Sequence, residues 1–370
     1  MTMWDRRQFL IRTSGSVLGL SAGSLIWRAV AQDEGSQARG MINQPTQEAI
    51  DRGLAFLASA QAPDGSYGTG QWRGNVAITA LCGLAFMAGG SQPGRGRYGQ
   101  IVTRCVDNLT NPNNAQQMPQ PRGTFITNGA GGHGPMYGHG FATLFLAEVY
   151  GMVNEPNLRD RLRRVLRDAV QLIVNSQNQE GGWRYRPGGA DADISVTICQ
   201  IMALRAARNA GIEVPVETVR RCVQYVKDCQ DVHGTGGFRY QRFGGPPGFA
   251  RTAAGVVALN SAGIYDDESV RKGLDYMMRY KPGAERGGFG LPNLEHQFHW
   301  YYGHYYAVQA MWIRGGDYWR QWYPAIRNEL LQNRRADDSW QMGMMCQHYC
   351  TAMALIILQV PNNYLPILQR

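Results

Sequence analysis

Gly181-Gly182-Trp183-Arg184-Tyr185 is the clearest copy of a motif that divides the chain into similar units. The motif is a turn of glycine, a small residue and an aromatic residue, and it recurs six times. Successive aromatic residues are 51 to 58 residues apart, and this period is typical of repeat proteins in which each unit is a helical pair. The other copies are Gly65-Ser66-Tyr67, Gly123-Thr124-Phe125, Gly236-Gly237-Phe238, Gly287-Gly288-Phe289 and the degenerate Asp338-Ser339-Trp340.

Two kinds of helical segment alternate between these turns. Amphipathic segments that carry arginines begin at Thr46 and then cover residues 98–109, 158–176, 216–229, 268–280 and 318–333. Segments rich in apolar and small residues cover 75–87, 137–150, 193–208, 249–262, 300–313 and 345–359. A helix without a polar face is buried on all sides. The alternation therefore predicts an all-α double ring, with the apolar helices inside and the amphipathic helices outside.

Residues 1–31 have the features of an export signal. The paired arginines of Asp5-Arg6-Arg7-Gln8-Phe9-Leu10 precede a mildly apolar stretch over 13–27 and the small-residue exit Ala29-Val30-Ala31. This order is typical of a secretory signal, and it resembles the twin-arginine type. The resemblance implies export of folded protein to the periplasm or cell envelope of a bacterium, the alternative being an uncleaved anchor. We expect residues 32–45 to form a flexible lead-in and 46–370 to form a single domain.

Composition and charge argue against several classes of partner. Without residues 1–31 the formal net charge falls from +9 to +6, and no run of five basic residues occurs, so we expect no nucleic-acid partner. No later stretch reaches the roughly 18 apolar residues of a membrane span, so we expect no stable span once the signal is removed. The seven cysteines are scattered over helical segments and are interpreted mainly as small core residues. Oligomeric state stays open.

A longer motif around the first turn resembles that of a known family. Arg52-Gly53-x-x-Phe56-Leu57-x-x-x-Gln61-x-x-x-Gly65-x-Tyr67 is similar to the glutamine-aromatic repeat of squalene and oxidosqualene cyclases, with partial copies at Gln177 and Gln230. The chain therefore looks like the terpenoid cyclase and protein prenyltransferase superfamily. This resemblance implies an α/α toroid of six helical hairpins and covers nearly all of the chain after the signal. Full triterpene cyclases carry two such domains, whereas this chain has the length of one.

Polar, titratable and aromatic residues gather at one end of the inner helices, a pattern typical of a ligand pocket; the alternative is a rim of helix caps. We aligned the helices on Ala85, Ala147, Ala203, Ala258, Ala310 and Ala354. Six positions earlier stand Thr79, Phe141, Thr197, Thr252, His304 and His348. Eight positions earlier stand Ala77, His139, Ser195, Ala250, Tyr302 and Cys346. Ten positions earlier stand Asn75, Tyr137, Asp193, Gly248, Trp300 and Met344.

This alignment predicts an aromatic cavity built from Tyr137, Trp300 and Tyr301, with Trp72 as a further ligand-binding residue. Clustered aromatic faces can stabilise a carbocation, although plain core packing also accounts for them. Arg251 stands beside a glycine-rich loop at 244–248 and is a candidate for holding an anionic group of the ligand.

A histidine-rich loop over residues 131–140 is a further candidate site. It contains His133 and His139 among several glycines, which let a backbone approach a ligand closely. His296, His299 and His304 repeat the pattern later in the chain. Of these residues, His139 is our candidate for a catalytic role.

Asp191 and Asp193 are the candidate acids. In squalene–hopene cyclases an Asp-x-Asp-Asp-Thr/Ser segment at an inner-helix start supplies the proton that begins cyclisation. Asp193 matches the central acid of that motif and Ser195 its hydroxyl, whereas Ile194 replaces the third aspartate. Because protonating an alkene requires an unusually strong acid, this loss argues against full cyclase chemistry. Asp193 as a helix N-cap is the alternative.

His304, Cys346 and His348 are candidate ligands of a zinc ion. Protein prenyltransferases hold zinc with an Asp-x-Cys pair at one inner-helix start and a histidine at a neighbouring one. Cys346 and His348 match that pair in spacing, and the ligand types suit zinc with one open position. Residues two apart point about 200° apart on an ideal helix, so joint chelation requires an irregular first turn. The alternative is hydrogen-bonded histidines at a buried rim.

The function predicted from these residues is that of an exported enzyme acting on an isoprenoid or other lipid in the cavity, related to terpenoid cyclases or to zinc-dependent prenyltransferases. The alternative is a non-catalytic module that binds a peptide or glycan at the rim. A glycan-active enzyme ranks third, because it needs two carboxylates across the cavity. Only the segment with Asp191 and Asp193, together with Glu148 or Glu295, offers such a pair.

Overall fold

The computed structural model describes residues 40–129, 134–283 and 299–369. The chain divides into two compact units, Met1–Met41 and Ile42–Arg370, and every element named below belongs to the second. The predicted export signal at 1–31 lies outside the described residues, as do His133, Glu295 and His296.

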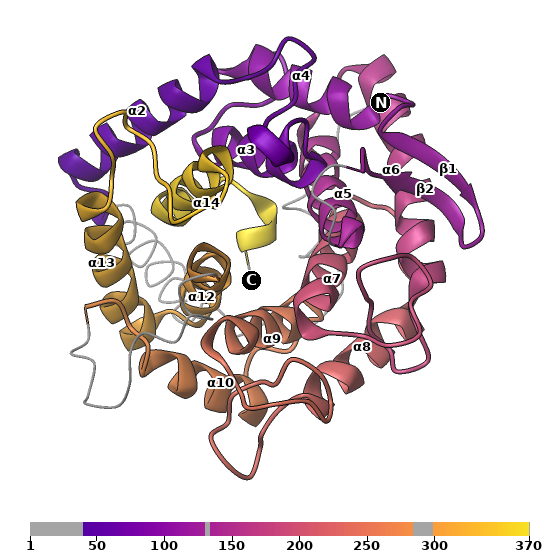
Figure 1. The fold of residues 1–370 in the computed structure, drawn as a ribbon, viewed down its shortest axis with the longest axis vertical. Coiled ribbons are helices and arrows are strands. Elements are labelled where there is room, and N and C mark those ends of the chain that lie inside the picture. The colour runs from indigo at the N-terminus through magenta and orange to yellow at the C-terminus, as the bar shows by residue number, and fades with distance from the viewer. Residues whose placement is uncertain (1–39, 130–133, 284–298, 370) are drawn as a thin grey trace, which may run out of the picture. The chain divides into compact units, whose positions relative to one another are not determined.

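Six helices of the second unit form an inner ring (Figure 1). Each contacts the next along the chain, and the last contacts the first, so the ring closes. Their residues are buried on nearly every face, which is the environment that apolar side chains all round a helix require. The inner helices are α3 (Val76–Ala88), α5 (Pro135–Met152), α7 (Ile194–Asn209), α9 (Phe249–Ser261), α12 (Trp300–Arg314) and α14 (Gln347–Gln359).

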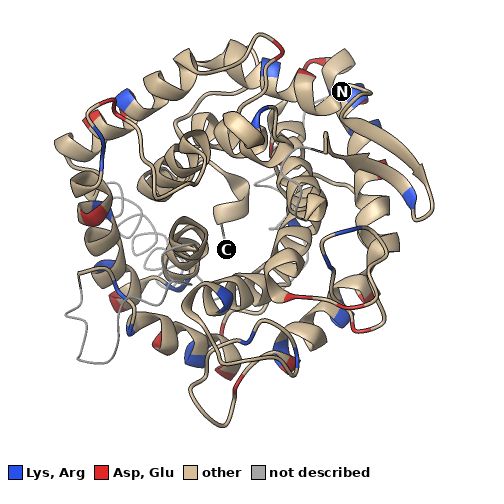
Figure 2. Ribbon diagram, viewed as in Figure 1, with Lys and Arg blue, Asp and Glu red and all other residues tan. Residues whose placement is uncertain are grey.

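Six amphipathic helices surround this ring, so the predicted α/α toroid is confirmed for the second unit. The charged residues among those described are mostly on these outer helices and on the connecting loops (Figure 2). The outer helices are α2 (Gln44–Ser59), α4 (Gly99–Thr110), α6 (Pro156–Ser176), α8 (Val216–Asp228), α10 (Glu268–Met278) and α13 (Gly316–Gln332). Helix α2 begins two residues before the predicted Thr46, because the side chain of Asn43 caps it by accepting from the Thr46 N–H at 3.1 Å.

In three repeats the glutamine of the motif ties one outer helix to the next. The Gln177 side-chain amide donates to the carbonyl oxygens of Gly181 at 2.8 Å and Thr218 at 2.9 Å. Gln61 and Gln230 make the same pair of bonds in their own repeats. Gly181 has a positive φ of 95°, and a Cβ there would lie 2.4 Å from the carbonyl oxygen of Arg221 in α8. Only glycine fits so close an approach.

The second repeat contains a β-hairpin that the sequence analysis did not predict. Strands β1 (Ala115–Pro119) and β2 (Arg122–Ile126) pair antiparallel, with Ala115 opposite Ile126. The turn motif of this repeat, Gly123-Thr124-Phe125, lies within β2. Strand β2 packs on α6, so the motif keeps its place between the two rings.

The end of the chain fills the centre of the ring on one side (Figure 1). The short helix η4 (Pro366–Leu368) contacts α7 and α12. The Ile367 N–H donates to the Glu148 carboxylate at 3.2 Å, and Arg205 donates to the Gln369 carbonyl. Glu148 and Arg205 both stand near the C-terminal ends of their helices. The ring is therefore filled at that end, and the N-terminal ends of the inner helices face the other side.

Candidate functional site

One position near the start of each inner helix faces the outer ring. Thr79, Thr197, Thr252 and Thr351 accept the backbone N–H of Tyr67, Trp183, Phe238 and Trp340, the motif aromatics of their repeats, at 2.9–3.1 Å. His139 takes this position in α5, where its Nδ1 accepts the Ile126 N–H at 3.2 Å. His304 lies at the corresponding depth of α12, with ring contacts to Phe249 and Trp322. We call this equivalent position in the six inner helices the bracing position, and its six residues the bracing residues.

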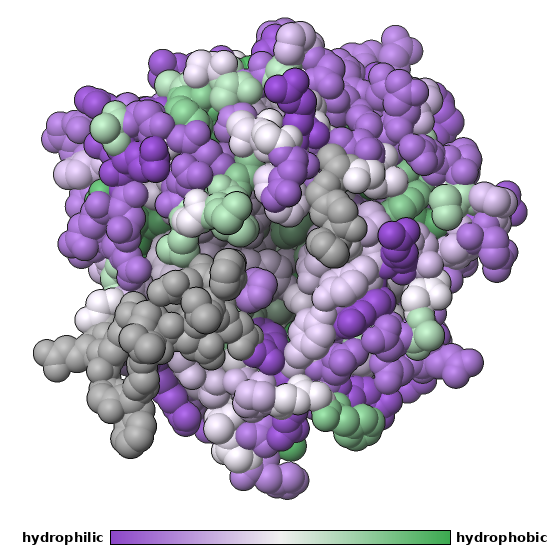
Figure 3. All heavy atoms as spheres, viewed as in Figure 1, coloured by the Kyte–Doolittle hydropathy of each residue, from purple (hydrophilic) through white to green (hydrophobic). Residues whose placement is uncertain are grey.

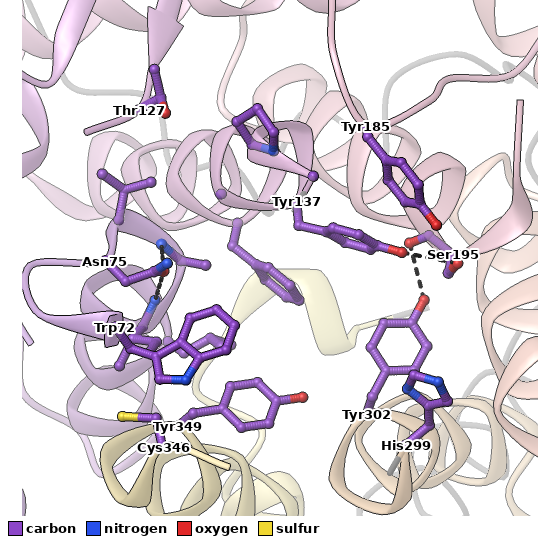
Figure 4. Close-up of a pocket in the computed structure, with 18 of the residues that line it drawn as sticks. Trp72, Asn75, Thr127, Tyr137, Tyr185, Ser195, His299, Tyr302, Cys346 and Tyr349 are labelled. Atoms are coloured by element: carbon purple, nitrogen blue, oxygen red, sulfur yellow. Dashed lines mark hydrogen bonds between the residues drawn. The ribbon is translucent and has the colours of Figure 1, made fainter. Parts of the chain in front are cut away.

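The residue two places before each bracing residue faces the middle of the ring. Two residues span about 200° of an α-helix, so an outward bracing residue implies an inward residue two places earlier. All six inward residues line one cavity (Figure 4). They are Ala77, Tyr137, Ser195, Ala250, Tyr302 and Tyr349.

The cavity has a volume of about 1040 Å³ and lies among the N-terminal ends of the inner helices. Further aromatic residues complete its wall, and Arg186 and Arg251 also border it. Among the described residues of this lining there is no Asp or Glu. On the face drawn in Figure 3 the molecule is hollowed near the middle of the ring, with mainly hydrophilic residues around it. The other aromatic lining residues are Trp72, Phe125, Phe141, Tyr185 and Tyr240.

Hydroxyl groups gather on one wall of the cavity, around the start of α7. The Tyr137 hydroxyl donates to Ser195 Oγ at 3.0 Å, and Ser195 Oγ donates to Asp193 Oδ1 at 2.6 Å. The Tyr302 hydroxyl donates to the Ser195 carbonyl at 3.0 Å (Figure 4). The Tyr185 hydroxyl shares a hydrogen bond with Tyr240. This wall, which we call the hydroxyl wall, is the polar side of an otherwise mainly apolar cavity.

Asp193 lies behind the hydroxyl wall and does not itself line the cavity. Its side chain is fully buried, caps α7 by accepting from Val196 N at 2.9 Å, and pairs with Arg184 Nη1 at 3.1 Å. Burial raises the pKa of Asp193, whereas bonds from Ser195 and Val196 and the charge of Arg184 act to lower it. Asp191 lies at the surface, 3.5 Å from Arg184 Nε, and also does not line the cavity. The two predicted acids therefore share Arg184 but have very different exposure.

The catalytic prediction for His139 is not supported by its position. Its side chain is fully buried between α5 and the outer ring, with Nδ1 accepting from Ile126 and Nε2 3.2 Å from the Ala169 carbonyl. Burial lowers the pKa of His139 to about 4. Both ring nitrogens thus bond to the backbone, on the side of α5 that faces away from the cavity. His139 braces its repeat as threonine does in others.

The structure does not bring the three predicted zinc ligands together. His348 faces outward, where its Nδ1 accepts the Gly68 N–H at 3.1 Å and its ring contacts Phe56 and Tyr67. Cys346 lines the cavity, whereas His304 packs toward α13. Cys346 precedes α14 as its N-cap, His348 lies in the first turn of that helix, and His304 stands on α12. In the described part of the chain no group of three His, Cys, Asp or Glu residues is placed to hold a metal ion.

The predicted ligand-binding residues divide into two groups. Trp72, Tyr137 and Arg251 line the cavity. Trp300 and Tyr301 do not: both are buried on other faces of α12, where Trp300 contacts His304.

Four lining tyrosines were not among the predicted site residues: Tyr302, Tyr349, Tyr185 and Tyr240. Tyr349 stands two places before Thr351, so aligning α14 on its threonine would have found it, and Tyr302 stands two places before the bracing His304. Glu148, considered for a glycan-active site, is buried against the end of the chain and lies outside this lining.

No family model matches the chain, and no curated protein matches it in sequence. Solved structures do match in fold. The type II terpene cyclase MstE from Scytonema, as a variant holding the substrate geranylgeranyl dihydroxybenzoate, aligns with TM-score 0.57 and 12% identity over 87% of this chain and 98% of that one. The apo enzyme aligns with TM-score 0.57 and 14% identity, over 87% of this chain and 100% of that one. A protein from Actinoplanes aligns with TM-score 0.50 and 14% identity, over 86% of this chain and 99% of that one. The chain has a terpenoid cyclase-like fold.

Proposed function

We propose that the protein binds an isoprenoid or similarly apolar lipid in its central cavity. The observation that carries this proposal is the cavity of about 1040 Å³ with aromatic and aliphatic walls. Small-molecule sites typically measure roughly 300–1,000 Å³ and combine apolar walls with a few polar groups. A peptide- or glycan-binding module would instead favour a shallow polar bowl at the rim.

The structural neighbours support the same class of ligand. MstE, which shares the toroid, was solved with geranylgeranyl dihydroxybenzoate as its substrate and merosterolic acid A as its product. Aromatic faces such as those of Trp72, Phe141 and Tyr349 border the cavity on several sides, and they can stabilise positive charge that develops along an isoprenoid.

Acid catalysis by Asp193 is a separate step of the proposal. This role requires the protonated acid, which burial favours and the charge of Arg184 disfavours, and its proton reaches the cavity only through Ser195 and Tyr137. Product analysis by mass spectrometry after incubation with geranylgeranyl substrates tests this role. Asp193→Asn should abolish turnover and leave ligand binding intact, and because asparagine also caps helices, stability should change by about 1–2 kcal/mol at most. Unchanged turnover would exclude Asp193 as the acid.

Cavity-filling substitutions test the binding proposal. Ala77→Trp and Ala250→Trp place a large ring at two inward positions, so calorimetric titration with geranylgeraniol should show at least roughly tenfold weaker binding for each variant. Val216→Trp is the matched control, because Val216 is 82% exposed on the outer ring. Failure of the unaltered protein to bind, or equal binding by all variants, would reject the proposal.

Export by the twin-arginine route is part of the proposal and rests on the sequence at 1–31. Replacing both Arg6 and Arg7 by lysine should keep the protein in the cytoplasm of an expressing bacterium, as measured by cell fractionation and blotting. The described part of the chain contains no helix with the length and apolar character of a membrane span.

A further inference from the structure

Asp193 determines where the protons of the hydroxyl wall point. The ionised carboxylate only accepts hydrogen bonds, and it is surrounded by donors: Val196 N, Ser195 Oγ and Arg184 Nη1. Burial raises the pKa of Asp193, whereas these donors and the nearby Tyr240 hydroxyl act to lower it. Because Arg184 stays charged, this arrangement suits an aspartate that is itself ionised.

The direction of each further hydrogen bond follows from the first. Ser195 has one hydroxyl proton, which it gives to Asp193 at 2.6 Å. The proton in the 3.0 Å bond between Tyr137 and Ser195 therefore comes from Tyr137. The Tyr302 hydroxyl donates its hydrogen bond to the Ser195 carbonyl, which can only accept. Burial raises the pKa of Tyr137 and Tyr302, so both stay protonated.

Both phenols thus turn their protons into the wall while their rings border the cavity. Each phenol oxygen keeps lone pairs that can accept further hydrogen bonds. We infer that the hydroxyl wall is a hydrogen-bond acceptor subsite, which selects a lipid that carries a hydroxyl or other O–H or N–H donor over one whose polar group only accepts. This inference rests on the proposed binding of a lipid in the cavity and applies to the ionised Asp193, whereas the acid role proposed above requires the protonated form. Asp193 and Ser195 act in it as positioning residues, and Tyr137 as the contact to the ligand.

The polarity of the wall depends on the charge of Asp193. A protonated Asp193 would have a proton to donate, and the chain through Ser195 to Tyr137 could then reverse and offer a donor to the cavity. An alcohol both donates and accepts, whereas its methyl ether only accepts. Comparing these two ligands therefore distinguishes the two directions. One neutral hydrogen bond corresponds to roughly a three- to tenfold difference in affinity.

The experiment is calorimetric titration of the protein with geranylgeraniol and with its methyl ether. We expect the alcohol to bind about five- to tenfold more tightly. Tyr137→Phe should bring the ratio close to one by weakening alcohol binding alone. Ser195→Ala should also lower the ratio, because Tyr137 loses the partner that holds its proton inward. Tyr349→Phe is the matched control: Tyr349 lines the same cavity outside the hydroxyl wall, and its variant should keep the ratio.

Each contrary result has a distinct meaning. If the alcohol and the ether bind equally to the unaltered protein, or the ether binds more tightly, the acceptor subsite is refuted while lipid binding stands. If the ratio persists in Tyr137→Phe, the acceptor is not Tyr137 and the inference fails. If neither ligand binds, the inference falls together with the proposed function. The comparison of the alcohol with its methyl ether uses the unaltered protein, so this test does not depend on the folding of any variant.

Discussion

Acid should destabilise the protein through His139 in a way that a single substitution removes. His139 is fully buried, and its pKa falls from an ordinary 6.5 to about 4 in the folded state. The folded pKa is the lower one, so between these values the unfolded chain binds more protons than the folded chain. Stability therefore falls as the pH drops through this window, and the contribution is fully present only above about pH 6.5.

The size of the effect follows from the two pKa values. Linkage with pKa values of 6.5 and about 4 gives a loss of about 2 kcal/mol between pH 7 and pH 5. The variant His139→Thr should lack this loss, because threonine serves at the same bracing position as Thr79 and Thr197 and does not titrate. We therefore expect the stability of the variant relative to the unaltered protein to rise by about 2 kcal/mol from pH 7 to pH 5.

The comparison must be made between the two proteins because other buried groups titrate in the same range. Burial raises the pKa of Glu148 to about 7, which makes stability fall as the pH rises and so opposes His139. Burial also lowers the pKa of His348. Both groups are present in both proteins, and their contributions cancel in the difference.

Urea unfolding followed by circular dichroism at pH 5, 6 and 7 measures this difference. Two stability curves that run parallel over this range would refute the reasoning, because they would show that His139 titrates alike in the folded and unfolded chain. A larger drop for the variant than for the unaltered protein at pH 5 would refute it as well.

Three further predictions follow from the buried contacts. Gln230→Leu leaves two buried carbonyls without their 2.9 and 2.8 Å bonds and should cost about 2–4 kcal/mol in urea unfolding, whereas the half-buried Gln61→Leu should cost about half as much. Gly181→Ala, at φ 95° and 2.4 Å from the Arg221 carbonyl, should cost at least about 2 kcal/mol; a smaller change in the midpoint would contradict this. Glu148 has a folded pKa of about 7, so the folded protein disfavours its charged form. The stability of Glu148→Gln relative to the unaltered protein should therefore rise by about 2–3 kcal/mol from pH 5 to pH 9. Thermal melts of both proteins at the two pH values measure this difference.

The double ring could be predicted from sequence because its signals are independent of exact register. A turn with an aromatic residue recurs with each hairpin and is preceded by a glutamine in three of them, and the structure gives this glutamine the same bonds in different repeats, as at Gln177 and Gln230. Apolar residues all round a helix require burial whatever its rotation. The β-hairpin escaped prediction because Gln116, Gln117 and their neighbours lack the apolar alternation of a half-buried strand.

The site was only partly predictable, because it depends on the rotation of each helix. Every residue turns an α-helix by about 100°, so an alignment error of two or three residues exchanges the cavity face for the outer face. The alanine alignment made such errors in α5, where it paired Phe141 rather than His139 with Thr79, and in α14, where it chose His348 rather than Thr351. The zinc prediction depended on the second of these errors.

Alanine is a poor marker of rotation because a small apolar side chain fits any face of a buried helix. A buried threonine is a better one, since its hydroxyl requires a partner and the motif N–H in the outer layer provides it. The polar residue of each inner helix that braces the turn therefore fixes the rotation, and the residue two places earlier must face the cavity. Applied to the sequence alone, this rule yields Tyr137, Ser195 and Tyr302, and in the hydroxyl wall both tyrosines donate to Ser195. The bonds that hold the toroid together thus also determine which side chains can meet a ligand.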